Sequence, residues 1–366
     1  MKKLWLVLWL MMLVVPTTTA QENDFDTDAL TMVIEDFAAT LTPDAAVAVA
    51  IVTPDGQIGL AAGRADDTRV ATPDDHFRIG SMSKTFVAVT ALRLVKEGVI
   101  ALDDLAADWL PDEIVARIAN ADSVTLRQLL AMQSGIDDYL GYGAFWEAIV
   151  ADPTRSWTVE EALAYAYDLP PLFAPGDQFS YSNTNYLLLQ VILETATGQP
   201  LDALVRYFVL DPLSLENTYT QNFEDPPSAG QATLVKAFED WDGDGTVDEV
   251  SWINDGAGLG DGALISNVFD VATFYRALFE EQTLLSADSL EAMLTIAEDG
   301  EAGYGLAIGQ WETDYGTAIG HSGGVTGFIT TGMILPEEGI TIIVLCADAD
   351  CDPDLLAESL LDEIMS

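Results

Sequence analysis

Strand-forming runs lie at both ends of this chain, and the long segment between them has a helical pattern. Near the start, AAVAVAIVT and QIGLAAG flank the turn Pro54-Asp55-Gly56, which is typical of a hairpin. After Gly300 the runs GTAIGHSG, GVTGFITTGMIL and GITIIVLCA again favour strands. If the two ends form one antiparallel sheet, the helical segment is an insertion, and a cleft is expected where the parts meet.

We therefore predict an α+β fold, an α/β/α sandwich in which helices flank an antiparallel sheet. The sheet part takes residues 26–80 and 300–366, and the mostly helical part takes residues 81–299. A helix is expected from Asp26 to Leu41, where apolar residues recur at helical spacing, and another from Asp352 to Ile364.

The balance of charge excludes whole classes of partner. The chain has 60 Asp and Glu against 14 Lys and Arg, a net charge of −46. Nucleic acid is excluded as a partner because phosphate binding needs clustered Lys and Arg, and an anionic membrane surface would repel this protein. We expect a small-molecule or peptide substrate, no cofactor and a monomer.

The first twenty residues have the layout of a secretory signal peptide. Two lysines precede an apolar run from Leu4 to Val15, and Pro16 and Ala20 follow. The apolar run is shorter than the ~20 residues of a membrane span. We predict cleavage near Ala20, a mature chain of 21–366 without a membrane span, and a secreted or periplasmic location. The alternative is an uncleaved anchor.

The first chemical motif is Gly80-Ser81-Met82-Ser83-Lys84, at the start of an apolar helical run. Residues at i and i+3 share a helix face, so the Lys84 amine can reach the Ser81 hydroxyl. A serine becomes a nucleophile when a neighbouring base takes its proton. On its own, S-x-x-K is equally consistent with a helix cap beside a solvated lysine.

Two further clusters could complete such a site. In Tyr181-Ser182-Asn183, a phenol near a cationic lysine can shuttle protons, and an amide can orient lysine and substrate. In the run from Gly320 to Gly324, placed between two expected strands, glycines admit a substrate close to backbone N–H groups that can bind an oxyanion. Each cluster alone would more often be structural.

Together, in this order, the three clusters resemble the serine β-lactamase and penicillin-binding protein superfamily, with its S-x-x-K, Y-x-N or S-x-N, and K-T-G or H-x-G elements. D-alanyl-D-alanine carboxypeptidases and class C β-lactamase-like hydrolases are most similar. The resemblance includes HFRIGSMSKTF, VTLRQLLAMQSGIDDY, FSYSNTNYLLL, GALISNVFDVATF and GHSGGVTGF, and extends from about Asp26 to the end.

The resemblance implies a role for each matching residue. Ser81 would be the acylated nucleophile and Lys84 its partner base, although Tyr181 could take the serine proton instead. Tyr181 would protonate the leaving group and Asn183 would position it, while His321 stands where many relatives have lysine.

The backbone N–H groups of Ser81 and Gly324 would form the oxyanion hole, and Ser322 and Gly323 would complete the substrate-binding strand. The expected activity is cleavage of an amide or ester through an acyl-enzyme, without a metal. The alternative is a catalytically silent protein of the same fold that binds a β-lactam or cell-wall peptide.

One departure bears on the substrate. Carboxypeptidase relatives can hold a terminal carboxylate with an arginine near H-x-G, but this chain has no Lys or Arg after Arg276. Unless an arginine from the helical part reaches the cleft, this anchor is missing. An esterase or another amide hydrolase is favoured over a strict carboxypeptidase.

Two features lie outside these motifs. Cys346 and Cys351, the only cysteines, could pair into a small loop in an exported chain. The segment Asp240–Asp248 has the D-x-D-x-D-G spacing of a calcium loop, but Ser251 occupies the twelfth position, where a Glu is expected. In a chain this acidic, a chance acidic turn is the favoured explanation, and we predict no metal site.

Overall fold

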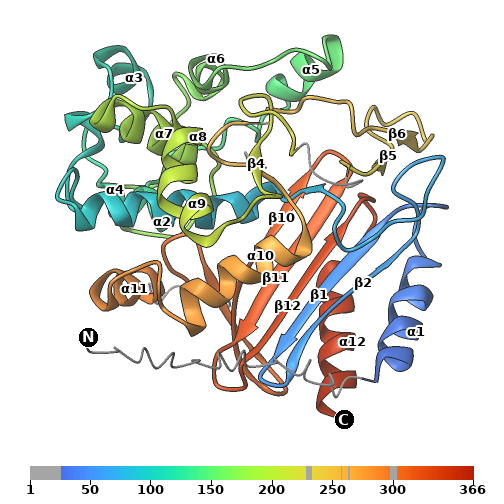
Figure 1. Cartoon of the computed structure of the whole chain (residues 1–366). Coiled ribbons are helices and arrows are strands. Elements are labelled where there is room, and N and C mark those ends of the chain that lie inside the picture. The colour runs from blue at the N-terminus through green and yellow to red at the C-terminus, as the bar shows by residue number, and fades with distance from the viewer. Residues whose placement is uncertain (1–25, 228–232, 257, 263, 297–302) are drawn as a thin grey trace, which may run out of the picture.

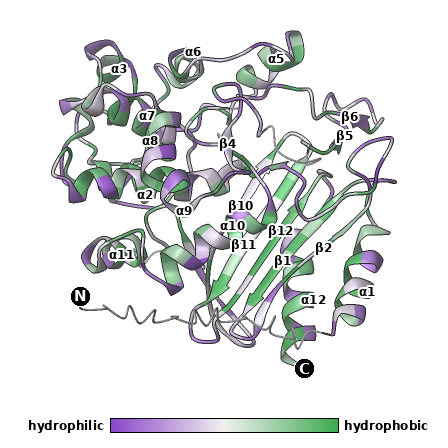
Figure 2. Ribbon diagram, viewed as in Figure 1, coloured by the Kyte–Doolittle hydropathy of each residue, from purple (hydrophilic) through white to green (hydrophobic). Residues whose placement is uncertain are grey.

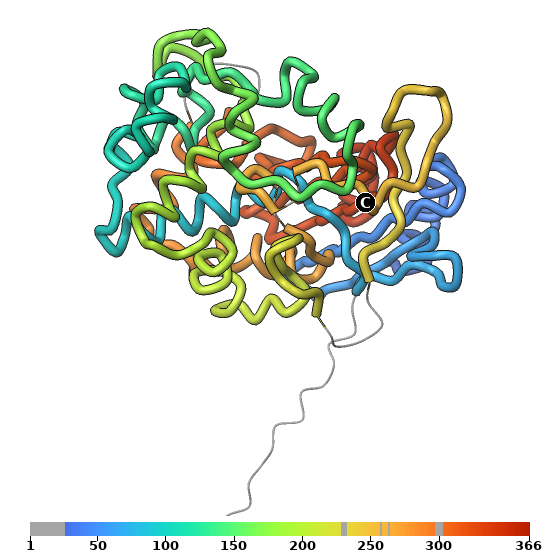
Figure 3. Tube along the Cα trace, turned by 90° about the horizontal axis from the view of Figure 1, so that it is seen from above, coloured from blue at the N-terminus to red at the C-terminus, as the bar shows by residue number. Residues whose placement is uncertain are grey.

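A seven-stranded antiparallel sheet organises the fold in this computed structural model, which describes residues 26–227, 233–256, 258–262, 264–296 and 303–366. The strand order is β2-β1-β12-β11-β10-β9-β8, so strands from the two ends of the chain lie side by side (Figure 1; Figure 3). Its strands are β1 (Val47–Thr53), β2 (Gly56–Ala62), β8 (Gly303–Tyr304), β9 (Gly309–Thr313), β10 (Gly316–Val325), β11 (Phe328–Leu335) and β12 (Ile340–Cys346). The predicted α+β fold is confirmed.

Alternate residues of β1 face two different layers of the core. Val47, Val49 and Ile51 pack in one apolar cluster with α1 and α12. Ala48 and Ala50 face the opposite side, in the larger cluster that includes α10. The flanking helices are α1 (Thr27–Ala38), α10 (Val268–Tyr275) and α12 (Pro353–Met365). Burial on both faces explains why β1 is almost wholly apolar (Figure 2).

The segment between the two parts of the sheet is mainly helical and packs at one end of the sheet (Figure 1). Its remaining α-helices are α2 (Ser83–Lys96), α3 (Asp112–Arg117), α4 (Leu126–Leu130), α5 (Ala144–Ala151), α6 (Val159–Leu163), α7 (Thr184–Thr197), α8 (Leu201–Val205), α9 (Asp211–Leu213) and α11 (Ala287–Leu294). Short 3-10 or π-helical turns are η1 (Gly80–Met82), η2 (Ala106–Asp108), η3 (Ala164–Ala166), η4 (Arg206–Leu210) and η5 (Arg276–Glu280).

Short strands also occur around these helices. They are β3 (Phe77–Arg78), β4 (Tyr219–Thr220), β5 (Phe238–Glu239), β6 (Asp248–Glu249) and β7 (Leu264–Ser266). A small sheet has the order β3-β7-β4, and β5 pairs with β6. The small sheet pairs the residues just before Gly80 and Ser81 with β7.

The glycine-rich run Gly320–Gly324 lies inside strand β10 rather than between two strands, which corrects our expectation. β10 pairs with β11 without interruption from Ile319 to Val325. The turn comes only at Thr326 and Gly327, where Gly327 has φ +75°. A glycine in the left-handed backbone conformation suits a tight hairpin turn, whereas the earlier glycines of the run have the extended backbone of a strand.

Cys346, at the end of β12, and Cys351, just before α12, form a disulfide, as the sequence suggested. The predicted signal peptide, residues 1–20, lies outside the described residues. Within the described ranges, no helix combines the length and the apolar character that crossing a membrane requires.

We predict that Phe274→Ala destabilises the protein by about 3–5 kcal/mol, because a buried aromatic ring leaves a cavity when it is removed. Phe274 on α10 stacks on Phe86 of α2 with ring centroids 3.7 Å apart, and both rings are fully buried. Urea unfolding measures the change. As control, Phe223→Ala, at a ring that is 53% exposed, should cost less than about 1 kcal/mol. Equal losses in the two variants would contradict this packing.

Candidate active site

Ser81 lies in the 3-10 turn η1, which joins β3 to α2 and packs against β10. Gly80 makes this packing possible. Its φ is +51°, and a Cβ at this position would lie 2.8 Å from the backbone nitrogen of Gly324. Only glycine combines this conformation with such a close approach. The serine is therefore fixed beside the backbone of β10, at a half-buried position.

Lys84 is fully buried, and its ammonium nitrogen contacts three oxygen atoms from three parts of the chain. Nζ lies 2.9 Å from Ser81 Oγ, 2.8 Å from Asn183 Oδ1 and 2.6 Å from the carbonyl oxygen of Asp261. Burying a charge is costly unless it is hydrogen-bonded, and these contacts supply one acceptor for each N–H of the ammonium. The S-x-x-K spacing thus brings the two side chains together as predicted.

Two carboxylates, those of Asp138 and Asp261, make hydrogen bonds around the groups that contact Lys84. Asn183 Nδ2 donates to Asp138 Oδ2 at 2.9 Å, which orients Asn183 Oδ1 toward Lys84. Asp261 accepts a hydrogen bond from the Tyr139 hydroxyl at 3.0 Å. Burial raises the pKa of Asp138, and it raises the pKa of Asp261 to about 6.

We did not identify Asp138, Tyr139 or Asp261 from the sequence. Asp138 and Tyr139 lie in the segment SGIDDY that formed part of the resemblance, and this was the only signal for them. Asp261 contributes a backbone carbonyl, and any residue type can do so.

Tyr181 lies beside the lysine and 37% of it is exposed. The centre of its ring is 5.2 Å from Lys84 Nζ. A second ring, that of the buried Tyr186, lies 5.6 Å from the same nitrogen. Both rings can stabilise an ammonium through their negative faces. Tyr181 thus joins the group predicted from the sequence, and its exposure leaves it accessible to a substrate.

His321 lies near Tyr181, with ring centres 6.3 Å apart. Its Nδ1 is 2.5 Å from the carbonyl oxygen of Ser322, and its Nε2 is 2.8 Å from the hydroxyl of Tyr304. A carbonyl only accepts, so Nδ1 carries the proton and Nε2 accepts from Tyr304. Burial, together with the nearby Lys84 charge, lowers the pKa of His321 to about 4, although the hydrogen bond to the Ser322 carbonyl acts in the opposite direction. The imidazole is neutral at pH 7. Tyr304 is a further site residue that sequence reasoning missed.

Two cavities open at this site. The serine cavity, about 490 Å³, is lined by Ser81, Asn183 and Gly324 and, on its far side, by Arg78 and Trp146. The α12 cavity, about 430 Å³, is lined on one side by Tyr181 and His321 and on the other by Trp311, Met333, Asp354 and Glu358.

The serine cavity contains one cationic side chain, Arg78, and two of its three nitrogens already donate to protein oxygens. Its Nε donates to Gln221 Oε1 at 2.8 Å and its Nη2 to the carbonyl of Ser251 at 3.0 Å. Its Nη1 lies 3.9 Å from Asp255 Oδ1 and has no hydrogen-bond partner among the described residues. The guanidinium is nearly fully buried, so it braces the wall of the cavity.

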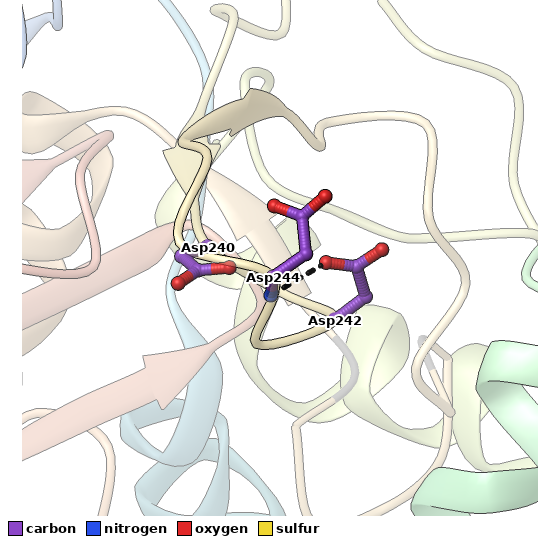
Figure 4. A group of neighbouring side chains, drawn as sticks. All are labelled: Asp240, Asp242 and Asp244. Carbon is purple, nitrogen blue, oxygen red and sulfur yellow. Dashed lines mark hydrogen bonds between the residues drawn. The ribbon is translucent and has the colours of Figure 1, made fainter.

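Asp240, Asp242 and Asp244 come together in the acidic loop, and all three are exposed (Figure 4). Backbone N–H groups of the loop already bond to the acids: Asp242 accepts from Asp244, and Asp240 accepts from Gly245. Ser251, at the twelfth position, bonds to Glu249. The loop is explained as a self-bonded acidic turn, and we assign no metal to it.

Known proteins match most of the chain. The β-lactamase family model matches residues 36–362. The D-aminopeptidase of Brucella anthropi is 28% identical over 343 residues, which are 88% of this chain and 60% of that protein. Esterase EstB of Burkholderia gladioli is 36% identical over 181 residues, 46% of each protein. The chain therefore spans about half the length of these curated relatives.

Among solved structures, a D-stereospecific amidohydrolase from Streptomyces sp. superposes with a TM-score of 0.80 at 28% identity. The match covers 91% of this chain and 98% of that one. The similarity to this hydrolase therefore extends over most of the chain, well beyond the motifs.

We predict that the imidazole of His321 titrates near pH 4, as burial and the neighbouring ammonium require. The unfolded imidazole binds its proton near pH 6.5, so this group makes the folded state less stable as the pH falls from 6.5 toward 4. A pH titration of the histidine Cε1–H signals by NMR measures the pKa, and a His321→Asn variant assigns the signal. A midpoint at or above the ordinary value would contradict the assigned environment.

Proposed function

The chain belongs to the β-lactamase family, and from that premise we propose that it is a serine hydrolase that cleaves an ester or amide through an acyl-enzyme on Ser81. The observation that carries the proposal is the 2.9 Å contact between Lys84 Nζ and Ser81 Oγ. Asn183 Oδ1 and the carbonyl of Asp261 can only accept, so a neutral amine would donate both of its protons to them. Its lone pair would then point at the serine hydroxyl.

In the acylation step, Ser81 Oγ attacks the substrate carbonyl carbon and its proton passes to Lys84 Nζ. The carbonyl oxygen becomes an oxyanion, which the backbone N–H groups of Ser81 and Gly324 would stabilise. The close approach of η1 to β10 at Gly80 supports this pairing of donors. Because Lys84 takes the serine proton in this scheme, Tyr181 is available to protonate the leaving group.

Collapse of the tetrahedral intermediate breaks the bond to the leaving group, whose oxygen or nitrogen needs a proton. The Tyr181 hydroxyl would supply it and recover it from Lys84. The ring contact of 5.2 Å to Lys84 Nζ supports such an exchange. Water then attacks the acyl-enzyme, the ester bond to Oγ breaks, and the acid product leaves with Ser81 restored. Asn183, held by Asp138, would position the amine throughout.

Esters and amides without a terminal carboxylate are the proposed substrates. Within the described residues, Arg78 is the only Lys or Arg that lines either cavity. Its Nε and Nη2 donate to protein oxygens, and its Nη1 is buried beside Asp255. The names of the esterase, aminopeptidase and amidohydrolase relatives support an ester or amide as the scissile bond, and the absence of a free cation among the described residues of the cavities supports the exclusion of a terminal carboxylate. We further propose that the protein is exported, on the evidence of residues 1–20.

A matched pair of lysine variants tests the proposal. Lys84 and Lys96 lie on the same helix α2, but Lys96 is exposed at its far end. With p-nitrophenyl acetate, nitrocefin and a D-Ala-D-Ala peptide as a panel, Lys84→Met should reduce kcat on every accepted substrate by about 10³-fold, the usual scale of general-base loss. Lys96→Met should leave kcat unchanged.

Ser81→Ala should abolish turnover of the same substrates while retaining the circular dichroism spectrum of the parent. Turnover that persists in Ser81→Ala, or equal rates in the two lysine variants, would refute the proposed mechanism.

A further inference from the structure

We propose that the α12 cavity binds the leaving group of the substrate and selects one with an apolar body and a positively charged end. The proposal deepens the function proposed above and rests on it. It comes from the division of the site residues between the two cavities and from the charges on helix α12.

Different site residues line the two cavities, and this indicates which cavity binds each half of the substrate. Ser81 and Gly324, which would hold the acyl carbon and its oxyanion, line the serine cavity. Tyr181, which would protonate the leaving atom, lines the α12 cavity together with His321. A proton donor must be within hydrogen-bond reach of the atom it protonates. The acyl group therefore occupies the serine cavity, and the leaving group enters the α12 cavity.

The sheet topology opens the α12 cavity beside β10. Strand β9 pairs with β10 only as far as Gly320, so the outer edge of β10 from His321 onward has no strand partner among the residues that the structure describes. Trp311 packs over Gly320, where a Cβ would lie 2.7 Å from its ring. Trp311, Met333 and Ala357 give the cavity an apolar wall. An aromatic or aliphatic group fits a wall of this kind.

The far side of the cavity carries two negative charges and no compensating cation. Asp354 and Glu358 lie one turn apart on α12, both exposed, and within the described part of the chain neither has an ion pair or a side-chain hydrogen bond. No described Lys or Arg lines this cavity. His321 is neutral, and the donors of the buried Lys84 are occupied. Uncompensated carboxylates in a concave site attract cations and repel anions.

Three phenylacetate esters test this inference. Their leaving groups are benzyl alcohols with a para aminomethyl, methyl or carboxymethyl substituent, and the methylene spacers keep the basicity of the three leaving oxygens similar. At low salt we expect kcat/KM to fall in the order cation, neutral, anion, with about a tenfold span. In 1 M NaCl the span should shrink to about twofold, because the Debye length falls to about 3 Å.

Charge-removing variants identify the source of the preference. Asp354→Asn with Glu358→Gln should reduce the ratio of kcat/KM between the cationic and anionic esters to about two. Glu363→Gln is the matched control: it removes one charge from the same helix at a residue that lines a different cavity, and it should keep the parent ratio. An unchanged ratio in the double variant, or an equal fall in the control, would overturn the inference.

The same experiment separates this inference from the proposed function. Turnover that depends on Ser81 but shows no charge preference refutes the inference alone. If the parent hydrolyses none of the esters, the three free alcohols are compared as protectants of Ser81 against a fluorophosphonate. The cationic alcohol should protect at the lowest concentration, and equal protection would refute the inference. Folded protein that shows neither turnover nor labelling refutes the proposed function and this inference with it.

Discussion

The buried ammonium of Lys84 is the constraint on which the rest of the site depends. A charge without solvent must find a full set of acceptors, and Lys84 takes them from the turn before α2, from the start of α7 and from the loop before β7. These segments are far apart in sequence, so the fold must bring them together before the lysine can be buried. The hydroxyl of Ser81, the proposed nucleophile, is one of the three acceptors.

Around this charge the protein uses neutral acceptors first and carboxylates second. The direct partners of Lys84 are a hydroxyl, an amide and a backbone carbonyl, whereas Asp138 and the side chain of Asp261 lie one contact further out. Burial raises the pKa of both acids, which means that it disfavours their ionised forms. A carboxylate in direct contact would hold the lysine charged, so this layering suits an amine that must release and accept protons.

The sequence predicted those parts of the site that depend on local spacing. Ser81 and Lys84 are one helical turn apart, and the hairpin of β1 and β2 surrounds an obvious turn, so both follow from the chain itself. Tyr304 and Asp261 could not be found in this way. Tyr304 contacts the site through His321, which is far from it in sequence, and Asp261 contacts Lys84 through its backbone carbonyl. Glycines inside β10 suggested a strand end, but pairing with β11 keeps the strand extended through them.

The most direct measurement of the central claim is the position of a covalent adduct on the folded protein. After reaction with a fluorophosphonate, peptide mapping by mass spectrometry should find the added mass on the peptide that contains Ser81 and on no other. The Lys84→Met variant should react far more slowly, and Ser81→Ala should remain unmodified. An adduct on a different residue, or equal rates for the parent and Lys84→Met, would contradict the account that the buried lysine activates this serine.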